Sequence, residues 1–266
     1  MFIIHFFKSN TAIFLKFSKI IIIAGVITNA MADPAAAAKR SADATAVGAK
    51  IDSAQNNSPK KHILLTNMAE FKGDRTLEGA SGFLINYHDK NYAVTARHLL
   101  GEAGGIEPEI KTSVLAKNLI EWKMAPRVAG TASQTIKLNA NGLDYSRSDY
   151  DLLLLNVEDK TPDLAILKPR FSLPEIGEAL HLIGCPYSER QCRQNSYDIK
   201  YVEYSERFGV LVCEIKSDVE LAGFSGAPVV NDKNEVVGVL VSGAEVRGKM
   251  YIFATHIKEI QRIKHL

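Results

Sequence analysis

The chain changes character near Lys61. From there to Leu266, short apolar or alternating runs are separated by Gly, Asn and Asp. Runs of roughly four to eight residues that are apolar or alternate with period two are typical of strands, whereas a helix repeats its apolar positions every three to four residues. The pattern predicts a β-rich domain. The expected strands are Ile63–Thr66, Gly82–Tyr87, Tyr92–Thr95, Thr135–Leu138, Leu152–Val157, Leu180–Gly184, Ile199–Tyr204, Val210–Ile215, Ala227–Val230, Val236–Ser242 and Tyr251–Ala254.

The strand pattern is interrupted once inside this region and changes once near its C-terminal end. A break from Lys160 to Pro174 divides the strands into two groups, residues 61–160 and 173–266. The isoleucines of Ile257–Ile263 recur at spacings of three, which fits one face of a helix. A region of about 200 residues is long enough to bury a sizeable core as one β-rich domain.

Residues 1–32 have the pattern of an export signal. Three lysines and no acidic residue accompany the apolar run Ile20–Ile27, and Ala30-Met31-Ala32 supplies small residues for cleavage after Ala32. An uncleaved membrane anchor is the alternative. We favour cleavage because the apolar run is shorter than the roughly 20 residues that span a bilayer.

Residues 33–60 are dominated by Ala, Ser, Lys, Asp and Asn, with Ile51 as almost the only large apolar residue. Such a segment buries too little surface to offset its ordering entropy, so we expect a flexible linker or pro-segment. The formal net charge of +2 becomes −1 once the three signal lysines are removed. No strongly basic surface then favours nucleic acid or anionic lipid as a partner, and no stable membrane anchor is expected. No pattern predicts an oligomeric state.

The three cysteines are Cys185, Cys192 and Cys213. An oxidising compartment permits one bridge and leaves one thiol over. Cys185 and Cys192 flank a polar loop and either form this bridge or remain thiols, because spacing alone does not determine their Cα geometry. Cys213 lies in an apolar run, where a buried small hydrophobe is expected. None has a companion at zinc-ligand spacing, so we expect no metal and no cofactor.

The segment Gly223–Pro228 holds Ser225 between two glycines and is the main candidate for a nucleophile. A serine hydroxyl needs a base to take its proton and a third group to orient that base. His98 follows a predicted strand, and Asp151 opens an apolar run. Because Gly223 has no Cβ, its N–H and that of Ser225 can point into one pocket and bind an oxyanion.

Each of these residues alone has an ordinary explanation as a surface histidine, a strand-edge carboxylate or a turn serine. His98 differs from the other histidines because small residues and a threonine precede it, as a turn presenting an imidazole requires. Asp149 lies two residues before Asp151, so in an extended chain its side chain would point to the same side. It is the second choice for the acid. We favour Asp151 because the aliphatic run begins directly after it.

In this order, the three segments resemble the trypsin-like (chymotrypsin-fold) serine peptidases, and more closely their bacterial and HtrA-like members without a PDZ domain than the digestive enzymes. Spacings of 53 residues from His98 to Asp151 and 74 from Asp151 to Ser225 suit that fold. The matching segments are Gly82–Ile85 with Val94–His98 for the first strand pair and histidine turn, Asp151–Leu155 for the Asp-plus-aliphatic strand, and Gly223–Pro228 for Gly-x-Ser-Gly-x-Pro.

The resemblance implies an all-β fold of two six-stranded-type β-barrels with a cleft between them and a C-terminal helix packed on the second barrel. It also implies a serine endopeptidase acting on peptides or proteins. His98 would take the Ser225 proton, Asp151 would orient His98, and the N–H groups of Gly223 and Ser225 would form the oxyanion hole. With the export signal, it places the protein in the periplasm or outside the cell.

The same resemblance suggests four substrate-binding residues. The family places the base of the first specificity pocket six residues before the nucleophile, which is Val219 here. An apolar base favours small or medium uncharged side chains, whereas a one-residue offset would place a carboxylate there and favour Lys or Arg. The opposite wall is expected from Val241, Ser242 and Gly243.

Phe224 is where the chain departs from the digestive enzymes. They carry Asp directly before the nucleophile, and that Asp pairs with a newly cut amino terminus to assemble the oxyanion pocket. Phe224 cannot form this ion pair. We therefore expect the oxyanion loop to be ordered by packing or by bound substrate.

Two other function classes compete with a peptidase. A trypsin-like fold used only for binding or scaffolding normally loses one of the three residues, and His98, Asp151 and Ser225 are all present. An α/β-hydrolase esterase would want glycine at position 227 and a helix after the serine. Ala227–Val230 favours a strand instead, and the order Ser, acid, His would leave His98 unused.

Overall fold

The computed structural model describes residues 61–128, 134–158, 164–189, 192, 194–216 and 219–265. The expected export signal (1–32) and linker (33–60) lie outside these residues, so both stay predictions. Over the described part of the chain, no helix is long and apolar enough to cross a membrane.

Six antiparallel strands close into a first barrel. Their hydrogen-bonded order is β1–β4–β5–β7–β3–β2, and β2 pairs back with β1. Closing a sheet on itself removes the exposed edges that would otherwise pair with other chains. The strands are β1 (Leu65–Phe71), β2 (Arg75–Tyr87), β3 (Lys90–Thr95), β4 (Leu119–Ala125), β5 (Ile136–Asn139) and β7 (Leu153–Val157).

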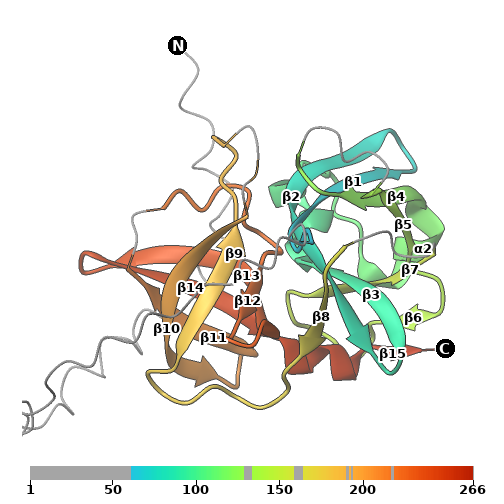
Figure 1. Cartoon of the computed structure of the whole chain (residues 1–266). Coiled ribbons are helices and arrows are strands. Elements are labelled where there is room, and N and C mark those ends of the chain that lie inside the picture. The colour runs from blue at the N-terminus through green and yellow to red at the C-terminus, as the bar shows by residue number, and fades with distance from the viewer. Residues whose placement is uncertain are drawn as a thin grey trace, which may run out of the picture. The chain divides into compact units, whose positions relative to one another are not determined.

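Six further antiparallel strands close into a second barrel in the order β13–β12–β9–β10–β11–β14, with β14 pairing back to β13. Figure 1 shows the two barrels side by side, the first in teal and green and the second in yellow to orange. The predicted all-β, two-barrel fold is confirmed. The strands are β9 (Ala179–Gly184), β10 (Asn195–Ser205), β11 (Val210–Ile215), β12 (Pro228–Val230), β13 (Glu235–Val246) and β14 (Lys249–His256).

The break predicted between the barrels is in part a strand, which corrects the sequence analysis. β8 (Ile166–Pro169) pairs in parallel with β2 on one side and with β13 on the other, so it joins the two barrels into one continuous sheet. Leu164 and Leu167 are buried there. The closely spaced prolines of this segment are typical of a loop, which is why the sequence did not predict the strand. Pro169 is the last residue of β8, a position at which a strand tolerates proline.

β4 was also missing from the predicted strands. It pairs with β1 and β5 and buries Trp122 and Met124. Trp122 packs edge-on against Phe71, with ring centroids 5.8 Å apart, and its indole N–H donates to Asn67 Oδ1 at 3.2 Å. The charged residues between the buried ones follow the period-two pattern of a strand with one exposed face.

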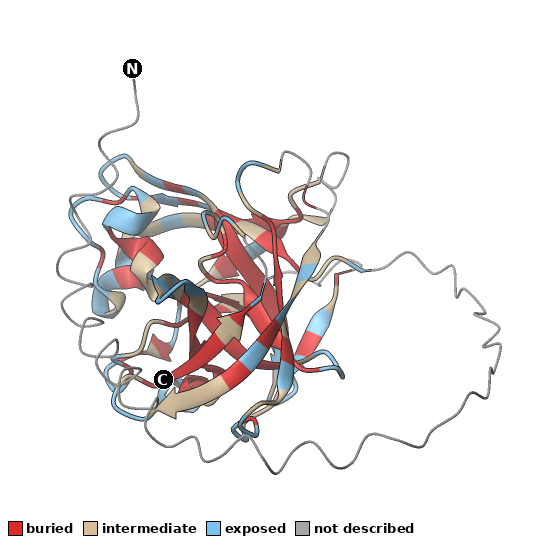
Figure 2. Ribbon diagram, turned by 90° about the vertical axis from the view of Figure 1, so that its left-hand side faces the viewer, coloured by how far each residue is buried: buried red, intermediate tan, exposed pale blue. Residues whose placement is uncertain are grey.

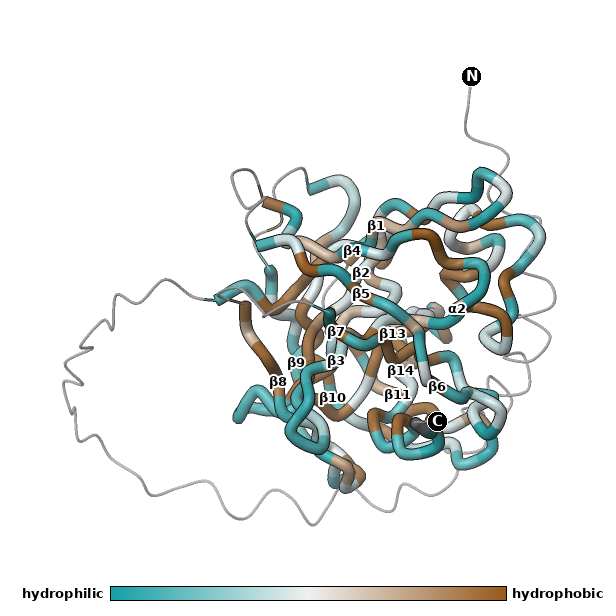
Figure 3. The backbone as a smooth tube through the Cα atoms, turned by 90° about the vertical axis from the view of Figure 1, so that its right-hand side faces the viewer, coloured by the Kyte–Doolittle hydropathy of each residue, from teal (hydrophilic) through white to brown (hydrophobic). Residues whose placement is uncertain are grey.

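The cores lie inside the barrels. Figure 2 shows buried residues in the interior, and Figure 3 shows the hydrophobic parts of the chain there with hydrophilic segments on the outer loops. Leu152–Leu155 are all buried, which is typical of a strand covered on both faces. The second barrel is filled by a cluster that includes Leu182, Leu211, Phe224 and Ile252.

The C-terminal helix is a six-residue 3₁₀ helix, Ile257–Arg262. Ile257, Ile260 and Ile263 are all buried. Their spacing of three matches the three residues per turn of a 3₁₀ helix. After this helix, β15 (Lys264–His265) pairs with β6 (Leu143–Asp144). Further helical segments in the described residues are the 3₁₀ helices Arg97–Leu100, Glu102–Gly104 and Thr112–Val114 and α2 (Leu115–Asn118).

The cysteines separate into a bridge and a buried thiol. Cys185 and Cys192 are joined, with Cα atoms 5.5 Å apart. Cys213 is buried on β11, and burial raises the pKa of its thiol to about 12. A thiol that stays protonated at neutral pH is a poor nucleophile, so Cys213 does not compete with Ser225 for that role.

We predict that burial of His256 makes the protein sensitive to acid. Its Nδ1 accepts from the Lys258 N–H at 3.0 Å, and burial, with the nearby Lys258 charge, lowers its pKa to about 4. In the unfolded protein the His256 imidazole has its ordinary pKa of about 6.5, so on acidification the unfolded state binds this proton before the folded state does. The free energy of unfolding should fall by about 2 kcal/mol between pH 7 and pH 4.5 from this group alone.

Urea denaturation of the wild type and of His256→Asn at the two pH values measures this effect. Asparagine keeps an acceptor for the Lys258 N–H but does not titrate, so its stability should fall less on acidification. Equal losses in both proteins would show that His256 is not the cause.

Candidate active site

His98 is presented by a short turn at the end of β3. The strand ends at Thr95, whose hydroxyl donates to the Ser81 carbonyl at 2.7 Å, and the 3₁₀ helix Arg97–Leu100 follows. Leu99 and Leu100 are buried and anchor this turn in the first barrel. The imidazole therefore stands at a fixed place on the side of the first barrel that faces the second.

Asp151 lies two residues before the start of β7 and contacts His98 twice. One carboxylate oxygen accepts from the His98 backbone N–H at 2.8 Å, and the other lies 2.6 Å from His98 Nδ1. Asp149 is exposed, and its backbone carbonyl accepts from the Arg97 guanidinium at 2.8 Å. The structure therefore brings Asp151, the first choice, to the imidazole.

Ser225 comes from the second barrel, in the turn before β12. Its Oγ lies 2.9 Å from His98 Nε2, so Asp151, His98 and Ser225 form one continuous line of hydrogen bonds. The two glycines around it have positive φ angles, +96° at Gly223 and +88° at Gly226. Side chains other than glycine rarely adopt this conformation, which explains the glycines on both sides of the serine.

The turn that carries Ser225 is hydrogen bonded to both barrels. The Ser81 N–H donates to the Ser225 carbonyl at 2.8 Å, and the Gly226 N–H donates to the Leu240 carbonyl at 2.8 Å. A Cβ at position 226 would lie 2.0 Å from the Ser81 carbonyl oxygen. Glycine is therefore required here for the two barrels to approach each other.

The electrostatics favour a charged Asp151 next to His98. Burial lowers the pKa of His98, but the charge of Asp151 and its hydrogen bond outweigh burial, and the pKa lies above its ordinary value. Burial raises the pKa of Asp151, and contact with His98 reverses this, so that it lies below its ordinary value. Asp151 thus stays ionised at neutral pH and stabilises the protonated imidazole.

The candidate oxyanion donors are the N–H groups of Gly223 and Ser225. Among the described residues, neither N–H donates to a protein acceptor. The Gly223 carbonyl accepts from the Ser81 hydroxyl at 2.7 Å. The first barrel thus holds the Gly223 carbonyl, and the N–H groups of Gly223 and Ser225 remain available for an oxyanion.

Phe224 anchors this turn in the second barrel. Its side chain is fully buried and packs edge-on against Tyr197, with ring centroids 5.6 Å apart. It fills the space beside Gly184, where a Cβ would lie 2.0 Å from the Phe224 ring. An apolar contact thus occupies the position where the digestive enzymes use an ion pair.

The four predicted substrate-binding residues lie on the second barrel. Val219 is partly buried against its core, and Val241, Ser242 and Gly243 follow one another on β13. Leu221, which no sequence pattern singled out, approaches Gly243 so closely that a Cβ there would lie 2.3 Å from Leu221 Cδ1. Leu221 therefore fills space next to the predicted wall.

Two other residues near the site were also missed. Thr255 donates its hydroxyl to the Asp151 backbone carbonyl at 3.1 Å, from the end of β14. Tyr187 lies in the loop between the bridged cysteines and contacts Gly223. Neither residue stands in a recognisable motif, so only the folded arrangement reveals them.

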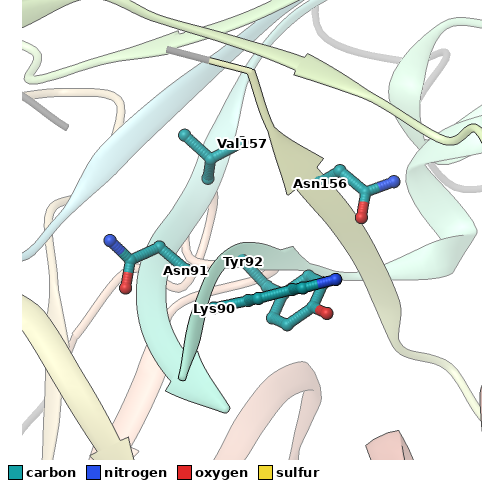
Figure 4. Close-up of a pocket in the computed structure, with 5 residues that line it drawn as sticks. All are labelled: Lys90, Asn91, Tyr92, Asn156 and Val157. Atoms are coloured by element: carbon teal, nitrogen blue, oxygen red, sulfur yellow. The ribbon is translucent and has the colours of Figure 1, made fainter. Parts of the chain in front are cut away.

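A pocket elsewhere on the first barrel is separate from this site. Figure 4 shows its lining residues, which come from the start of β3 and the end of β7. Because these strands are antiparallel, Tyr92 pairs with Asn156 at that end, whereas Thr95 pairs with Leu153 next to His98 and Asp151. The lining residues are Lys90, Asn91, Tyr92, Asn156 and Val157.

No metal site accompanies these groups in the described residues, where no three or more His, Cys, Asp or Glu side chains are arranged to hold an ion. The closed barrels with a serine, a histidine and a carboxylate between them define the class of trypsin-like peptidases. The chain belongs to this family: the family model of the trypsin-like peptidase domain matches residues 80–239. The resemblance seen in the sequence is confirmed.

Solved structures similar to this chain include three peptidases. The active form of the Rv3671c protease from M. tuberculosis is 16% identical over 76% of this chain and 78% of that chain, with a TM-score of 0.49. The serine endoprotease from Yersinia pestis is 17% identical over 75% and 60%, with a TM-score of 0.49. Kallikrein-related peptidase 10 is 14% identical over 74% and 91%, also with a TM-score of 0.49. No curated protein matches the sequence.

Proposed function

We propose that this chain is an exported serine endopeptidase that hydrolyses peptide bonds through an acyl-enzyme intermediate. The observation that carries the proposal is the hydrogen-bonded line from Asp151 through His98 to Ser225, with separations of 2.6 and 2.9 Å. Its members come from three segments far apart in the sequence, in a chain of the trypsin-like family. Such a line matches the nucleophile, base and orienting acid that acyl transfer requires.

In the proposed mechanism, Ser225 Oγ attacks the carbonyl carbon of the scissile peptide bond and His98 Nε2 takes its proton. Asp151 holds the imidazole in the tautomer that accepts this proton, and its charge stabilises the imidazolium. The N–H groups of Gly223 and Ser225 bind the oxyanion of the tetrahedral intermediate. His98 then protonates the departing amine, and water releases the acyl group by the same steps in reverse.

The oxyanion loop in this proposal is held by packing and needs no new amino terminus. The burial of Phe224 against Gly184 and Tyr197 supports this. We propose that substrates are peptides or proteins with a small or medium uncharged side chain at the cleavage site. The partly buried, apolar Val219 supports this preference, and Val241, Ser242 and Gly243 would form the facing wall.

Export is part of the proposal and rests on the sequence of residues 1–32. A cleavable signal would deliver residues 33–266 to the periplasm or the outside of the cell. The bridge between Cys185 and Cys192 is consistent with an oxidising compartment.

We predict that the protein without residues 1–32 cleaves a peptide library and that Ser225→Ala does not. Loss of the nucleophile should lower kcat by at least about 10³-fold, because only binding and the oxyanion donors remain. Ser205→Ala, a serine at the end of β10, is the matched control and should cleave normally.

A wild-type protein that is folded but cleaves no peptide would contradict the proposal and favour a binding or scaffolding role. Equal cleavage by the wild type and Ser225→Ala would exclude Ser225 as the nucleophile. The cleavage sites also test specificity, because cleavage mainly after Lys or Arg would contradict the apolar pocket.

We predict that kcat/KM rises with pH through a midpoint above the ordinary histidine value of about 6.5. His98 must be neutral to accept the proton, and its pKa is raised by Asp151. In Asp151→Asn, burial remains while the charge is lost, so the midpoint should move to lower pH. NMR titration of the His98 imidazole measures both values. An unchanged midpoint in Asp151→Asn would show that the carboxylate does not control His98.

A further inference from the structure

The loop closed by the Cys185–Cys192 bridge lies against the turn that carries Ser225, and Tyr187 makes the contact. We infer that Tyr187 is a positioning residue that holds the peptide unit between Ala222 and Gly223 with its N–H toward the reacting carbonyl. The inference rests on the proposed function, because it concerns the oxyanion hole of that site.

The main chain of Tyr187 sets the orientation of this peptide unit. The Tyr187 N–H donates to the Ala222 carbonyl at 3.0 Å. In a planar trans peptide, the carbonyl and the N–H of the next residue point in opposite directions. Holding the Ala222 oxygen on the loop side therefore turns the Gly223 N–H away from the loop. A rotated peptide unit would lose this hydrogen bond and withdraw one oxyanion donor.

The ring of Tyr187 limits the movement of Gly223. A Cβ at Gly223 would lie 3.0 Å from Tyr187 Cδ1, and a Cβ at Gly79 on β2 would lie 2.7 Å from the Tyr187 hydroxyl oxygen. Both positions need glycine, because the ring packs directly on their backbones. Tyr187 is 52% exposed, so these contacts do not arise from burial in a core. The ring therefore lies between Gly79 on the first barrel and Gly223 in the turn that carries Ser225.

The hydroxyl of Tyr187 is fixed by the first barrel. It accepts from the Ala80 N–H at 2.6 Å. Ala80 has a φ of +52°, which is rare for alanine, so the backbone is locally strained where it meets Tyr187. The next residue, Ser81, donates its hydroxyl to the Gly223 carbonyl at 2.7 Å. Gly223 is thus held by β2 on one side and by Tyr187 on the other.

The loop itself is fastened at several points. The bridge joins its two ends, and the Arg127 guanidinium donates to the carbonyls of Pro186 and Glu189 at 2.8 and 3.2 Å. Arg127 also lies 5.9 Å from the centroid of the Tyr187 ring, within cation–π range. These contacts keep Tyr187 in place without help from substrate.

Tyr187→Ala keeps the main-chain N–H but removes the ring and hydroxyl contacts that hold it against Gly223 and Ala80. We predict that it lowers kcat by about 10-fold to 100-fold with little change in KM, a partial loss of the roughly 10²-fold to 10³-fold that an intact oxyanion donor contributes. The inhibition constant of a peptide aldehyde, whose hemiacetal oxygen occupies the oxyanion hole, should rise by a similar factor. Tyr187→Phe keeps the ring contacts and loses only the Ala80 hydrogen bond, so it should lie between the wild type and Tyr187→Ala.

Tyr87→Ala is the matched control. Tyr87 is a partly exposed tyrosine at the far end of β2 and contacts Phe171 with ring centroids 5.7 Å apart. Its loss should reduce thermal stability without changing kcat. The midpoint of the pH profile should stay unchanged in Tyr187→Ala, because the hydrogen bonds of the His98 ring are to Asp151 and Ser225.

A measurement that does not need turnover separates this inference from the proposed function. The NMR order parameter of the Gly223 amide should be near the rigid-backbone value of about 0.85 in the wild type and should fall in Tyr187→Ala. This result would support positioning even if the wild type cleaved nothing. The inference would be overturned if Tyr187→Ala had the same kcat, the same aldehyde inhibition constant and the same Gly223 order parameter as the wild type. A raised KM with unchanged kcat would also overturn it, since Tyr187 would then only contact substrate.

Discussion

The arrangement of the whole site depends on one close approach between the barrels, where the backbone at Gly226 passes over the Ser81 carbonyl. Any side chain at position 226 would collide there, and the hydrogen bond from the Ser81 N–H to the Ser225 carbonyl is made at the same place. The side-chain amide of the buried Asn67 donates to the same Ser81 carbonyl at 3.2 Å and helps to fix its position. His98 and Ser225 belong to different barrels, so this junction determines the distance between them.

The residue before Ser225, where the digestive enzymes have an ion-paired Asp, is the buried Phe224. Phe224 is buried against Gly184, and the bridge begins at the next residue, Cys185. The same loop carries Tyr187 onto Gly223. These contacts do not depend on a newly formed charged terminus, and they pack directly on the backbone around Gly223 and Phe224. Beside this packing, the Asp151 carboxylate lies 2.6 Å from His98 Nδ1, where its negative charge stabilises the imidazole once it is protonated.

The sequence predicted the structure best where short segments contain the pattern that determines their conformation. The segments around His98, Asp151 and Ser225 could be predicted because small residues, glycines and an aliphatic strand are required next to each one. Most strands followed from apolar runs. β4 and β8 did not, because charged residues or prolines mask their short patterns. The contacts of Tyr187, Leu221 and Thr255 could not be predicted, since each joins segments whose proximity exists only after the barrels close.

The most direct test of the account is covalent labelling of the folded protein, without residues 1–32, by a peptidyl diphenyl phosphonate. We expect one adduct per chain, located on Ser225 by mass spectrometry, that forms faster as pH rises and His98 becomes neutral. Ser225→Ala should not be labelled. Absence of an adduct on the folded wild type, or equal labelling of Ser225→Ala, would contradict the claim that Asp151, His98 and Ser225 act together as a catalytic site.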